Sequence, residues 1–482
     1  MLIIFVTCVV CLGNALGEEF NLYGEAGQAY SVDVNLGHPH QKLSVIVDTG
    51  STTLAIASHP RIDSDIYFHA DNSSSIYDNQ KEVQAKYSQG MWVGRLISDY
   101  IQIPSLPSVL EVRSDIALIT KSHKFFMNGS GWQGLLGLAY LPVGAWGDHI
   151  VVESWLDSLE RTINKPVSFQ LQLCGPIATD NATHCGYFRI LDDQIQNENR
   201  SPMHITPILR KSWYEVGVIS VRLISSFDTQ SEMKESDTVS PSIDMCRTLN
   251  AEKSIVDSGT TNIRLPDTIF RQIVDELRNF AGQKANLLIL DEFWYRGEAA
   301  CWPEPQEWHL PWLAIDLLSD TCDHEYFTLM LTPQNYMRVV TAHNSSGEGG
   351  MVSEFCYKLG LEAGKKETVL GYTAMEGLQL LFNRSAGWIG WETSDCGPKA
   401  QIAGPYNLSM SLKDYCQLTH SDTDVAISIK AAQWALCAIS IIAGAVLLYL
   451  LAPCIKAFFI RRSDRSTQIS LSQAALVEQD VN

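Results

Sequence analysis

The sequence is poor in basic residues. Its 35 lysines and arginines are outnumbered by 54 aspartates and glutamates, which gives a formal net charge of −19. Proteins that bind nucleic acid hold its phosphates with a basic surface, so we expect no nucleic acid among the partners of this chain. The 482 residues are enough for two or three domains with sizeable cores.

Charge is also absent from the beginning of the chain. Residues 1–17 form a short apolar stretch that ends in Ala15-Leu16-Gly17, and two glutamates follow at once. This is the pattern of a secretory signal peptide, although the only positive charge at its start is the α-amine. The sequence therefore predicts an exported protein whose signal peptide is residues 1–17.

A second uncharged stretch runs from Ala431 to Ile455 near the C-terminus. It is long enough to cross a bilayer as one helix; a buried helix of a globular core is the competing interpretation, which the terminal position disfavours. Basic residues follow from Lys456 onward, whereas only Lys430 lies close before the stretch. Because positive charge marks the cytosolic side, we expect a type I membrane protein with a transmembrane helix at 431–455, a cytosolic tail at 456–482 and a lumenal or extracellular body.

The body between these ends is predicted to be mostly β. Period-two alternation from Tyr30 to Leu36, followed by Gly37-His38-Pro39, indicates a hairpin. Helical spacing of apolar residues is rarer. It marks one helix at 151–159 and another at 269–277, the latter beginning near Pro266-Asp267.

An acidic tripeptide occurs twice in the body. Asp48-Thr49-Gly50 and Asp257-Ser258-Gly259 each follow an apolar, strand-like run, and hydroxyl residues come after each. Downstream of each copy lies another apolar segment that contains glycine, Gly134–Leu138 in the first half and Thr368–Gly371 in the second. This is a weak internal duplication. It divides the body into an N-terminal lobe at 18–195 and a C-terminal lobe at 196–420.

The residue types of the doubled tripeptide suit general acid–base chemistry. Two carboxylates in contact cannot both ionise easily, so the pKa of one rises and the pair holds a single proton. The ionised aspartate would take a proton from water, and the protonated one would give a proton to the peptide carbonyl. The sequence does not tell which of Asp48 and Asp257 plays which part. Ser51 and Thr260 can donate hydrogen bonds to the ionised oxygens. This chemistry needs no cofactor and no metal ion, and we predict neither.

The chain resembles the pepsin-like aspartic proteases and, within them, the membrane-anchored beta-secretases, or memapsins. Four stretches carry the likeness: Tyr87–Trp92, Lys124–Tyr140, Ser168–Gly175 and Lys253–Pro266. The resemblance covers the chain from about Asn21 to Cys416. It implies a bilobal β fold with the active site in a cleft between the lobes, followed by a single transmembrane helix at the C-terminus.

The resemblance also implies roles for individual residues. Asp48 and Asp257 would be catalytic, and a flap would place Tyr87 over the substrate with Trp92 supporting it; from the residues alone both could be ordinary core aromatics. Arg264 stands where the family has a subsite arginine, which would favour acidic or polar side chains two residues before the cut, although a plain surface arginine is the competing interpretation. The complete set expected to contact substrate is Gly50, Ser51, Tyr87, Ser88, Gln89, Trp92, Gly259, Thr260, Thr261 and Arg264.

Two kinds of covalent modification are expected in an exported body. By resemblance, the disulfides are Cys174–Cys396, Cys246–Cys416 and Cys301–Cys356, while Cys185 and Cys322 have no match and either pair with each other or stay free. Glycosylation sequons occur at Asn72, Asn128, Asn181, Asn344, Asn383 and Asn407.

Two expected features of the family are missing from the sequence. Residues from Asn21 onward already align with the mature enzyme, so the pro-segment that usually follows the signal peptide is absent or nearly so. Either the enzyme is not held as a zymogen or the start of this sequence is incorrect. The predicted tail also lacks an acidic dileucine motif, which argues against endosomal sorting by that route.

Three functions are compatible with these patterns. The first is a membrane-bound, beta-secretase-like aspartic endopeptidase that cleaves the lumenal stalks of other membrane proteins, in the secretory pathway, in endosomes or at the cell surface. The second is a membrane-retained aspartic protease for soluble lumenal proteins. The third is a non-catalytic binding receptor on the same fold, against which both intact tripeptides and Tyr87 argue. Polypeptides and the lipid bilayer are thus the expected partners.

Overall fold

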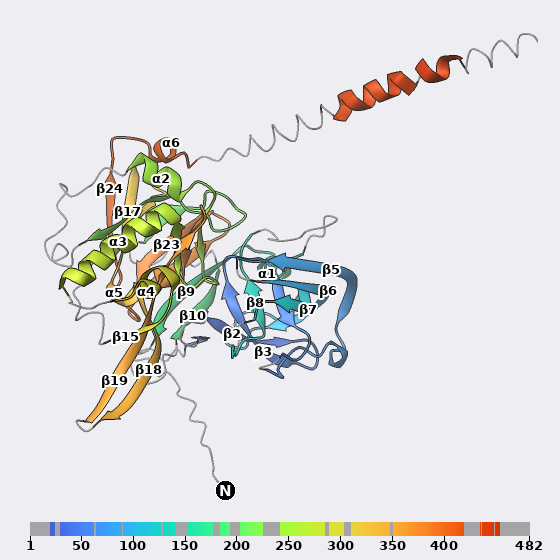
Figure 1. Cartoon of the computed structure of the whole chain (residues 1–482). Coiled ribbons are helices and arrows are strands. Elements are labelled where there is room, and N and C mark those ends of the chain that lie inside the picture. Colours follow the sequence, from blue (N-terminus) through green and yellow to red (C-terminus); the bar gives the residue numbers. More distant parts are fainter. Residues whose placement is uncertain are drawn as a thin grey trace, which may run out of the picture. The chain divides into compact units, whose positions relative to one another are not determined.

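A computed structural model gives the fold of the chain (Figure 1). It describes residues 20–24, 29–61, 64–88, 90–126, 129–140, 152–176, 184–192, 203–224, 242–284, 289–302, 310–347, 350–418, 434, 436–447 and 449–453. Residues up to Leu418 form one compact unit, and Thr419 begins a second. The predicted signal peptide at 1–17 and the predicted tail at 456–482 lie outside the described residues. The first unit is built mainly from strands, as the sequence predicts.

The largest sheet of the described first unit has thirteen strands. In spatial order they are β11 (His204–Pro207), β23 (Trp388–Thr393), β22 (Leu378–Asn383), β9 (Val167–Pro176), β10 (His184–Asp192), β1 (Leu22–Gly24), β2 (Ser31–Leu36), β3 (Gln41–Asp48), β8 (Gly134–Gly137), β4 (Leu54–Ala57), β7 (Val112–His123), β6 (Met91–Gln102) and β5 (Tyr77–Lys86). Its middle joins both halves of the sequence, because β9 of the first half pairs with β22 of the second. The predicted lobe boundary at residue 195 therefore lies just after a strand of this shared sheet, and it stays a prediction.

Three smaller sheets belong to the second half of the chain. The first contains β12 (Val218–Ile224), β16 (Trp312–Leu318), β17 (Glu325–Leu331) and β24 (Gln401–Asn407). The second contains β13 (Ser254–Asp257), β21 (Thr368–Gly371), β14 (Ile263–Pro266) and β20 (Leu361–Gly364). The third contains β15 (Ala300–Trp302), β19 (Gly350–Leu359) and β18 (Met337–Gly347).

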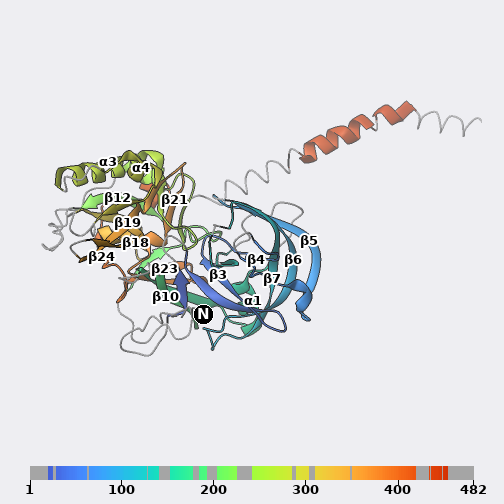
Figure 2. The ribbon, with the colours of Figure 1, turned by 60° about the horizontal axis from the view of Figure 1, so that its bottom comes forward.

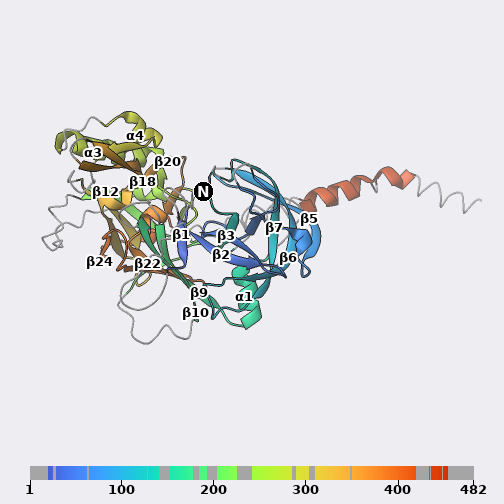
Figure 3. The same ribbon diagram turned by 90° about the horizontal axis from the view of Figure 1, so that it is seen from below.

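Both helices expected from apolar spacing are present. Helix α1 (Trp155–Ile163) begins later than the spacing suggested, because the Ser154 side chain accepts a hydrogen bond from the backbone N–H of Asp157 and so caps the first turn. Helix α1 packs on β7 and β9 (Figure 3). Helix α3 (Asp267–Lys284) starts where Pro266-Asp267 predicts and packs on β12, β14 and β20 (Figure 2). The other α-helices among the described residues of the first unit are short: α2 (Ile243–Leu249), α4 (Asp291–Arg296), α5 (Pro333–Tyr336) and α6 (Leu412–Cys416).

The two copies of the acidic tripeptide have the same local topology. Strand β3 runs parallel to β8, with Asp48 opposite Gly137, and β13 runs parallel to β21, with Asp257 opposite Gly371. Both predicted downstream segments are therefore the strands that support the two aspartates. The hairpin predicted around Gly37 is also present, since β2 and β3 pair antiparallel across the turn. The internal duplication seen in the sequence is thus real in the fold.

Aromatic side chains fill the core between the two halves. Phe169 and Phe382 stack with their ring centroids 4.6 Å apart, and Tyr214 contacts Phe382 edge-on at 4.7 Å. All three are fully buried. Burying each such side chain contributes roughly 1.5–3 kcal/mol, so this contact between β9 and β22 holds the shared part of the large sheet together.

The second unit contains an apolar helix. By length and composition, the 18 residues Leu436–Pro453 are sufficient to cross a membrane. Large apolar side chains along it, among them Leu436, Ile441 and Tyr449, are exposed. This helix lies within the predicted span at 431–455 and fits a transmembrane anchor.

Candidate active site

The two predicted catalytic aspartates lie at the ends of equivalent strands and face each other. Asp48 ends β3 and is 5% exposed, and Asp257 ends β13 and is half-buried. Each neighbouring glycine lies against the carboxylate of the other copy. A Cβ atom on Gly50 would be 2.5 Å from Cγ of Asp257, and one on Gly259 would be 2.3 Å from Oδ1 of Asp48. Any larger residue at either position would drive the two carboxylates apart, because such a contact is far too short.

Matching hydrogen bonds hold the two carboxylates. The backbone N–H of Gly50 donates to Asp48 Oδ1 at 2.9 Å, and that of Gly259 donates to Asp257 Oδ1 at 2.9 Å. The Ser51 hydroxyl donates to the other oxygen of Asp48, and the Thr260 hydroxyl donates to Asp257 Oδ2 at 2.6 Å. Both hydroxyl residues therefore occupy the positions that the sequence predicts for them.

Burial and mutual repulsion favour a proton on this pair. The pKa of Asp48 is raised, chiefly because the carboxyl group is buried and next because the carboxylate of Asp257 lies beside it. The hydrogen bonds from Ser51 and Gly50 act in the opposite direction and lower the pKa of Asp48. Because the raising effects on the pKa of Asp48 outweigh the lowering ones, the pair is suited to carry one shared proton.

A reciprocal set of hydrogen bonds locks the two tripeptides to each other. The Thr49 N–H donates to Ser258 Oγ at 3.1 Å, and the Ser258 N–H donates to Thr49 Oγ1 at 2.9 Å. Each hydroxyl also donates across the site, Thr49 to the carbonyl of Val256 at 2.9 Å and Ser258 to that of Val47 at 2.6 Å. Both side chains are fully buried. The sequence pattern assigns no role to Thr49 or Ser258. The only hint of their importance in the sequence is that both occupy the middle position of the repeated tripeptide.

Replacing Thr49 by Val should destabilise the first unit by about 1–3 kcal/mol, because the shape is kept but the buried N–H of Ser258 loses its acceptor. The change of Ser258 to Ala should act similarly, and the double variant should lose less than the sum because the four bonds form one network. Urea unfolding of each variant measures this. The control is Thr120→Val, whose exposed hydroxyl also donates to a backbone carbonyl; equal effects of the two threonine substitutions would contradict the prediction.

The predicted flap follows β5. The Tyr87 hydroxyl accepts a hydrogen bond from Trp92 Nε1 at 3.3 Å, and Trp92 is buried in β6. Burial and, next, the charge of Asp48 raise the pKa of Tyr87, so this hydroxyl stays protonated near the dyad. Ser88 is exposed at the tip, and Gln89 lies outside the described residues. The structure thus brings Tyr87 and Trp92 together as the resemblance implies.

Arg264 is not a plain surface residue. It is 9% exposed in β14, and its guanidinium donates to Glu362 Oε1 at 2.7 Å and lies 3.7 Å from Glu367. Because two carboxylates already neutralise this guanidinium, an acidic substrate side chain would have to compete with them for its charge. The subsite role of Arg264 stays a prediction.

The loop after Asp257 is held by hydrogen bonds that include Arg338, a residue that the sequence pattern does not mark. Thr260 and Thr261 are half-buried, and their carbonyls accept from the N–H groups of Tyr372 and Thr373 at 2.9 and 3.1 Å. Arg338 of β18 donates to Asn262 Oδ1 at 3.1 Å and to the Tyr372 hydroxyl at 3.0 Å. Nothing in the sequence pattern marks Arg338, because only the fold brings β18 to this loop.

The structure forms the three disulfides that the resemblance implies, Cys174–Cys396, Cys246–Cys416 and Cys301–Cys356. No disulfide joins Cys185 to Cys322: the first is buried in β10 and the second is exposed. Among the predicted glycosylation sites, Asn72 and Asn407 are exposed. Asn383 is 6% exposed, so attaching a glycan to its amide nitrogen would require this side chain to turn outward. Asn128 and Asn181 lie outside the described residues, as does the side chain of Asn344.

Comparison with known proteins agrees with this geometry. The family model for eukaryotic aspartyl proteases matches residues 29–391. The chain belongs to the eukaryotic aspartyl protease family. Similar proteins include a beta-secretase of Strongylocentrotus purpuratus, 30% identical over 444 residues that make up 86% of this chain and 77% of that protein. Vacuolar protease A of Aspergillus fumigatus is 24% identical over 53% of this chain and 58% of that protein. A vacuolar aspartic protease of Candida albicans is 24% identical over 53% of this chain and 56% of that protein.

As an aspartic endopeptidase, this protein would hydrolyse a peptide bond through the Asp48–Asp257 dyad. Burial of Asp48 and the neighbouring Asp257 carboxylate both raise the pKa of Asp48, which favours a single proton on the pair, placed on Asp48. From this position Asp48 can donate to the peptide carbonyl while Asp257 takes a proton from the attacking water. Ser51 and Thr260 hold the outer oxygens, so both carboxylates keep their orientation as the proton moves.

Proposed function

We propose that this aspartic protease is a type I membrane protein that cleaves the lumenal or extracellular stalks of other membrane proteins. The observation that carries the proposal is the apolar helix Leu436–Pro453 in the unit that follows the catalytic one. Basic residues come after this helix in the sequence, and three disulfides lie in the catalytic unit. Positive charge on the cytosolic side and disulfides in an oxidising compartment both support a lumenal catalytic unit.

The anchor would act by raising the effective concentration of substrates that share the membrane. Linking an enzyme and its substrate to one surface makes their encounter nearly intramolecular, which can raise apparent affinity by about 10²–10⁴ without any new contact. The similarity to a beta-secretase supports the same substrate class. A membrane-retained protease for soluble lumenal proteins is the second candidate, since the helix would serve retention equally well.

One substrate sequence presented in two forms should separate these functions. In vesicles that contain the full chain, a peptide stalk tethered by its own transmembrane helix should be cut at least about 10²-fold faster than the same peptide free in solution. A variant that lacks the residues after Leu418 should show no such preference. Glycans found on Asn72 or Asn407 of the same preparation would report that the catalytic unit is lumenal. Equal rates for tethered and free peptide with the full chain would favour the second candidate.

A further inference from the structure

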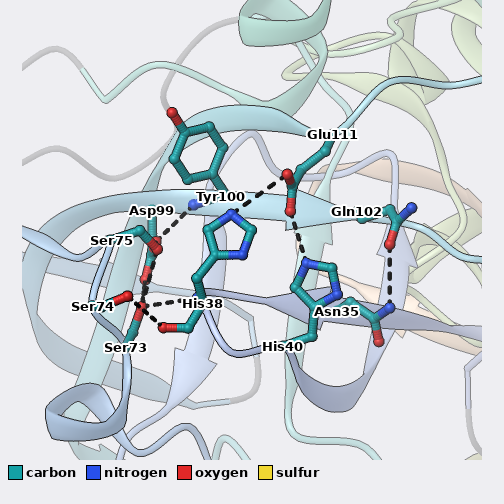
Figure 4. Close-up of polar contacts among 10 residues, drawn as sticks. All are labelled: Asn35, His38, His40, Ser73, Ser74, Ser75, Asp99, Tyr100, Gln102 and Glu111. Carbon is teal, nitrogen blue, oxygen red and sulfur yellow. Dashed lines mark hydrogen bonds and ion pairs between the residues drawn. The ribbon is translucent and has the colours of Figure 1, made fainter.

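Two imidazole rings and one carboxylate converge at the turn between β2 and β3, away from the dyad. His40 Nε2 is 2.9 Å from Glu111 Oε1, and His38 Nε2 is 3.5 Å from Glu111 Oε2. One donor atom from each of the three residues lies within 4.8 Å of the others. Figure 4 shows both rings pointing toward the same carboxylate.

The fold, rather than the sequence, assembles this group. His38 and His40 stand two residues apart in the turn, and their rings stack with centroids 5.1 Å apart. Glu111 lies 71 positions from His40, in the connection that leads from β6 to β7. Pairing of β2 with β6, where Leu36 faces Ile101, brings this connection beside the turn.

Hydrogen bonds hold the turn in place from behind. The N–H of His38 donates to Ser73 Oγ at 3.2 Å, and its carbonyl accepts from the Ser74 N–H at 2.7 Å. The Ser73 and Ser75 hydroxyls donate in turn to the fully buried carboxylate of Asp99 at 2.7 and 2.6 Å (Figure 4). The backbone that carries the two histidines is therefore fixed before any ligand binds.

The donor set points to a transition metal. We propose that His38, His40 and Glu111 form a three-ligand site for Zn²⁺, which Cu²⁺ would also occupy. Two imidazole nitrogens and one carboxylate suit these ions, whereas Ca²⁺ and Mg²⁺ prefer oxygen ligands alone. Zn²⁺ bonds of about 2.0–2.1 Å place tetrahedral ligand atoms ~3.3 Å apart. The distances from the two imidazole Nε2 atoms to the Glu111 carboxylate, 2.9 and 3.5 Å, lie on either side of this value. One ligand atom of each residue lies within 4.8 Å of the others, so the three side chains would draw together around the ion.

The site leaves room for a fourth ligand. The side chains of His38, His40 and Glu111 are 41%, 38% and 29% exposed, so water can reach the open position. Strand β3 extends from Gln41 to Asp48, and a strand rises about 3.3 Å per residue. The metal would lie at the far end of β3 from the dyad and would take no part in peptide hydrolysis. Its effect is to clamp the β2–β3 turn to the connection before β7.

Metal titration of the full chain in detergent, first freed of metal by a chelator, tests the site. Zn²⁺ added in competition with a chromogenic indicator should show one tight equivalent in the unmodified protein. His38→Ala, His40→Ala and Glu111→Gln should each weaken it by at least about tenfold, since even outer-shell substitutions at metal sites have effects of this size. The control is His123→Ala, an exposed histidine of β7 outside the group, which should bind Zn²⁺ unchanged.

A second measurement does not depend on the indicator. Zn²⁺ should raise the thermal unfolding temperature of the unmodified chain and of His123→Ala, because a ligand that binds only the folded state stabilises it. It should not raise that of His40→Gln or Glu111→Gln, which keep the size of the side chains. Absence of a Zn²⁺ equivalent in the unmodified chain would overturn the proposal, as would binding that all three substitutions leave unchanged. Proteolytic activity at the dyad should be the same in every variant, which shows that each is folded.

Discussion

Asp48→Asn should lower the rate of peptide-bond cleavage by at least about 10³-fold, and Asp257→Asn should do the same. Asparagine keeps the shape of aspartate and can still accept from Gly50 or Gly259. It cannot hold or release the shared proton, so no water is activated. Because both aspartates serve the same proton transfer, the double variant should be no slower than either single one. Cleavage of a peptide substrate by the full chain at acidic pH is the measurement.

The control substitution makes the same chemical change outside the site. Asp78→Asn alters an exposed aspartate of β5 that pairs with Arg95 at 3.1 Å, and it should leave cleavage unchanged. Binding of a statine-type inhibitor by the unmodified chain would show separately that the cleft is formed. Activity retained by either dyad variant would contradict the assignment of Asp48 and Asp257. Inhibitor binding without any cleavage by the unmodified chain would favour the receptor function instead.

The second large effect concerns Glu376, a buried acid that contacts Tyr30 and His184. The carboxylate of Glu376 accepts from the Tyr30 hydroxyl at 2.8 Å and lies 3.6 Å from Nδ1 of the buried His184. Burial raises the pKa of Glu376 to about 7, against the lowering effects of the Tyr30 hydrogen bond and the charge of Arg338. Burial, helped by Arg338, lowers the pKa of His184 to about 3. Both groups are therefore neutral in the folded protein at mildly acidic pH, beside the Tyr372 ring.

Glu376→Gln should change how stability depends on pH. Between pH 4.5 and 7 the carboxyl group of Glu376 ionises only in the unfolded chain, so it makes the native protein less stable as pH rises. At about 1.4 kcal/mol per pH unit, the loss approaches roughly 3 kcal/mol at pH 7. His184 has the opposite effect on stability. Between pH 3 and 6.5 its ring is protonated only in the unfolded chain, so it makes the native protein more stable as pH rises. Between pH 4.5 and 6.5 the pH dependences of stability due to Glu376 and His184 cancel each other. Glu376→Gln removes the first, so the stability of this variant should rise with pH through the contribution of His184 alone.

Urea unfolding of the full chain at several pH values measures the effect. The free energy of unfolding of Glu376→Gln, relative to the unmodified protein, should rise by about 3 kcal/mol from pH 4.5 to 7. Glu82→Gln, a change at an exposed position of β5, should show no such rise. His184→Leu should remove the opposite slope, because leucine binds no proton. It should break no hydrogen bond, since neither ring nitrogen has a hydrogen-bond partner among the described residues. A pH-independent difference for Glu376→Gln would contradict the prediction.

Much of the fold and of the catalytic pair could be predicted from local patterns. Asp48 and Asp257 are recognisable because each ends an apolar strand and is followed by a glycine, which here faces the other carboxylate, and by hydroxyl residues, which hydrogen-bond to their own. Helix α3 is recognisable because Pro266-Asp267 begins a regular apolar spacing. Helix α1 was placed too early, because apolar spacing does not show that Ser154 caps the first turn. Thr49 and Ser258 were overlooked, since a hydroxyl beside an acidic residue does not by itself show which backbone group it faces.

By itself, the sequence determined a mostly β body with two equivalent acidic turns and an apolar segment after it, because short motifs and periodicity are local properties. Its resemblance to the pepsin-like aspartic proteases supplied the activity. Only the tertiary structure decided which distant groups meet. It placed Gly50 against Asp257, Arg264 against Glu362, Glu376 beside His184, and His38 and His40 beside Glu111. These contacts join residues far apart in the chain, which meet only because strands pair and the turns and connections between the strands pack together. The raised pKa values of Asp48 and Glu376 and the proposed metal site are consequences of these contacts.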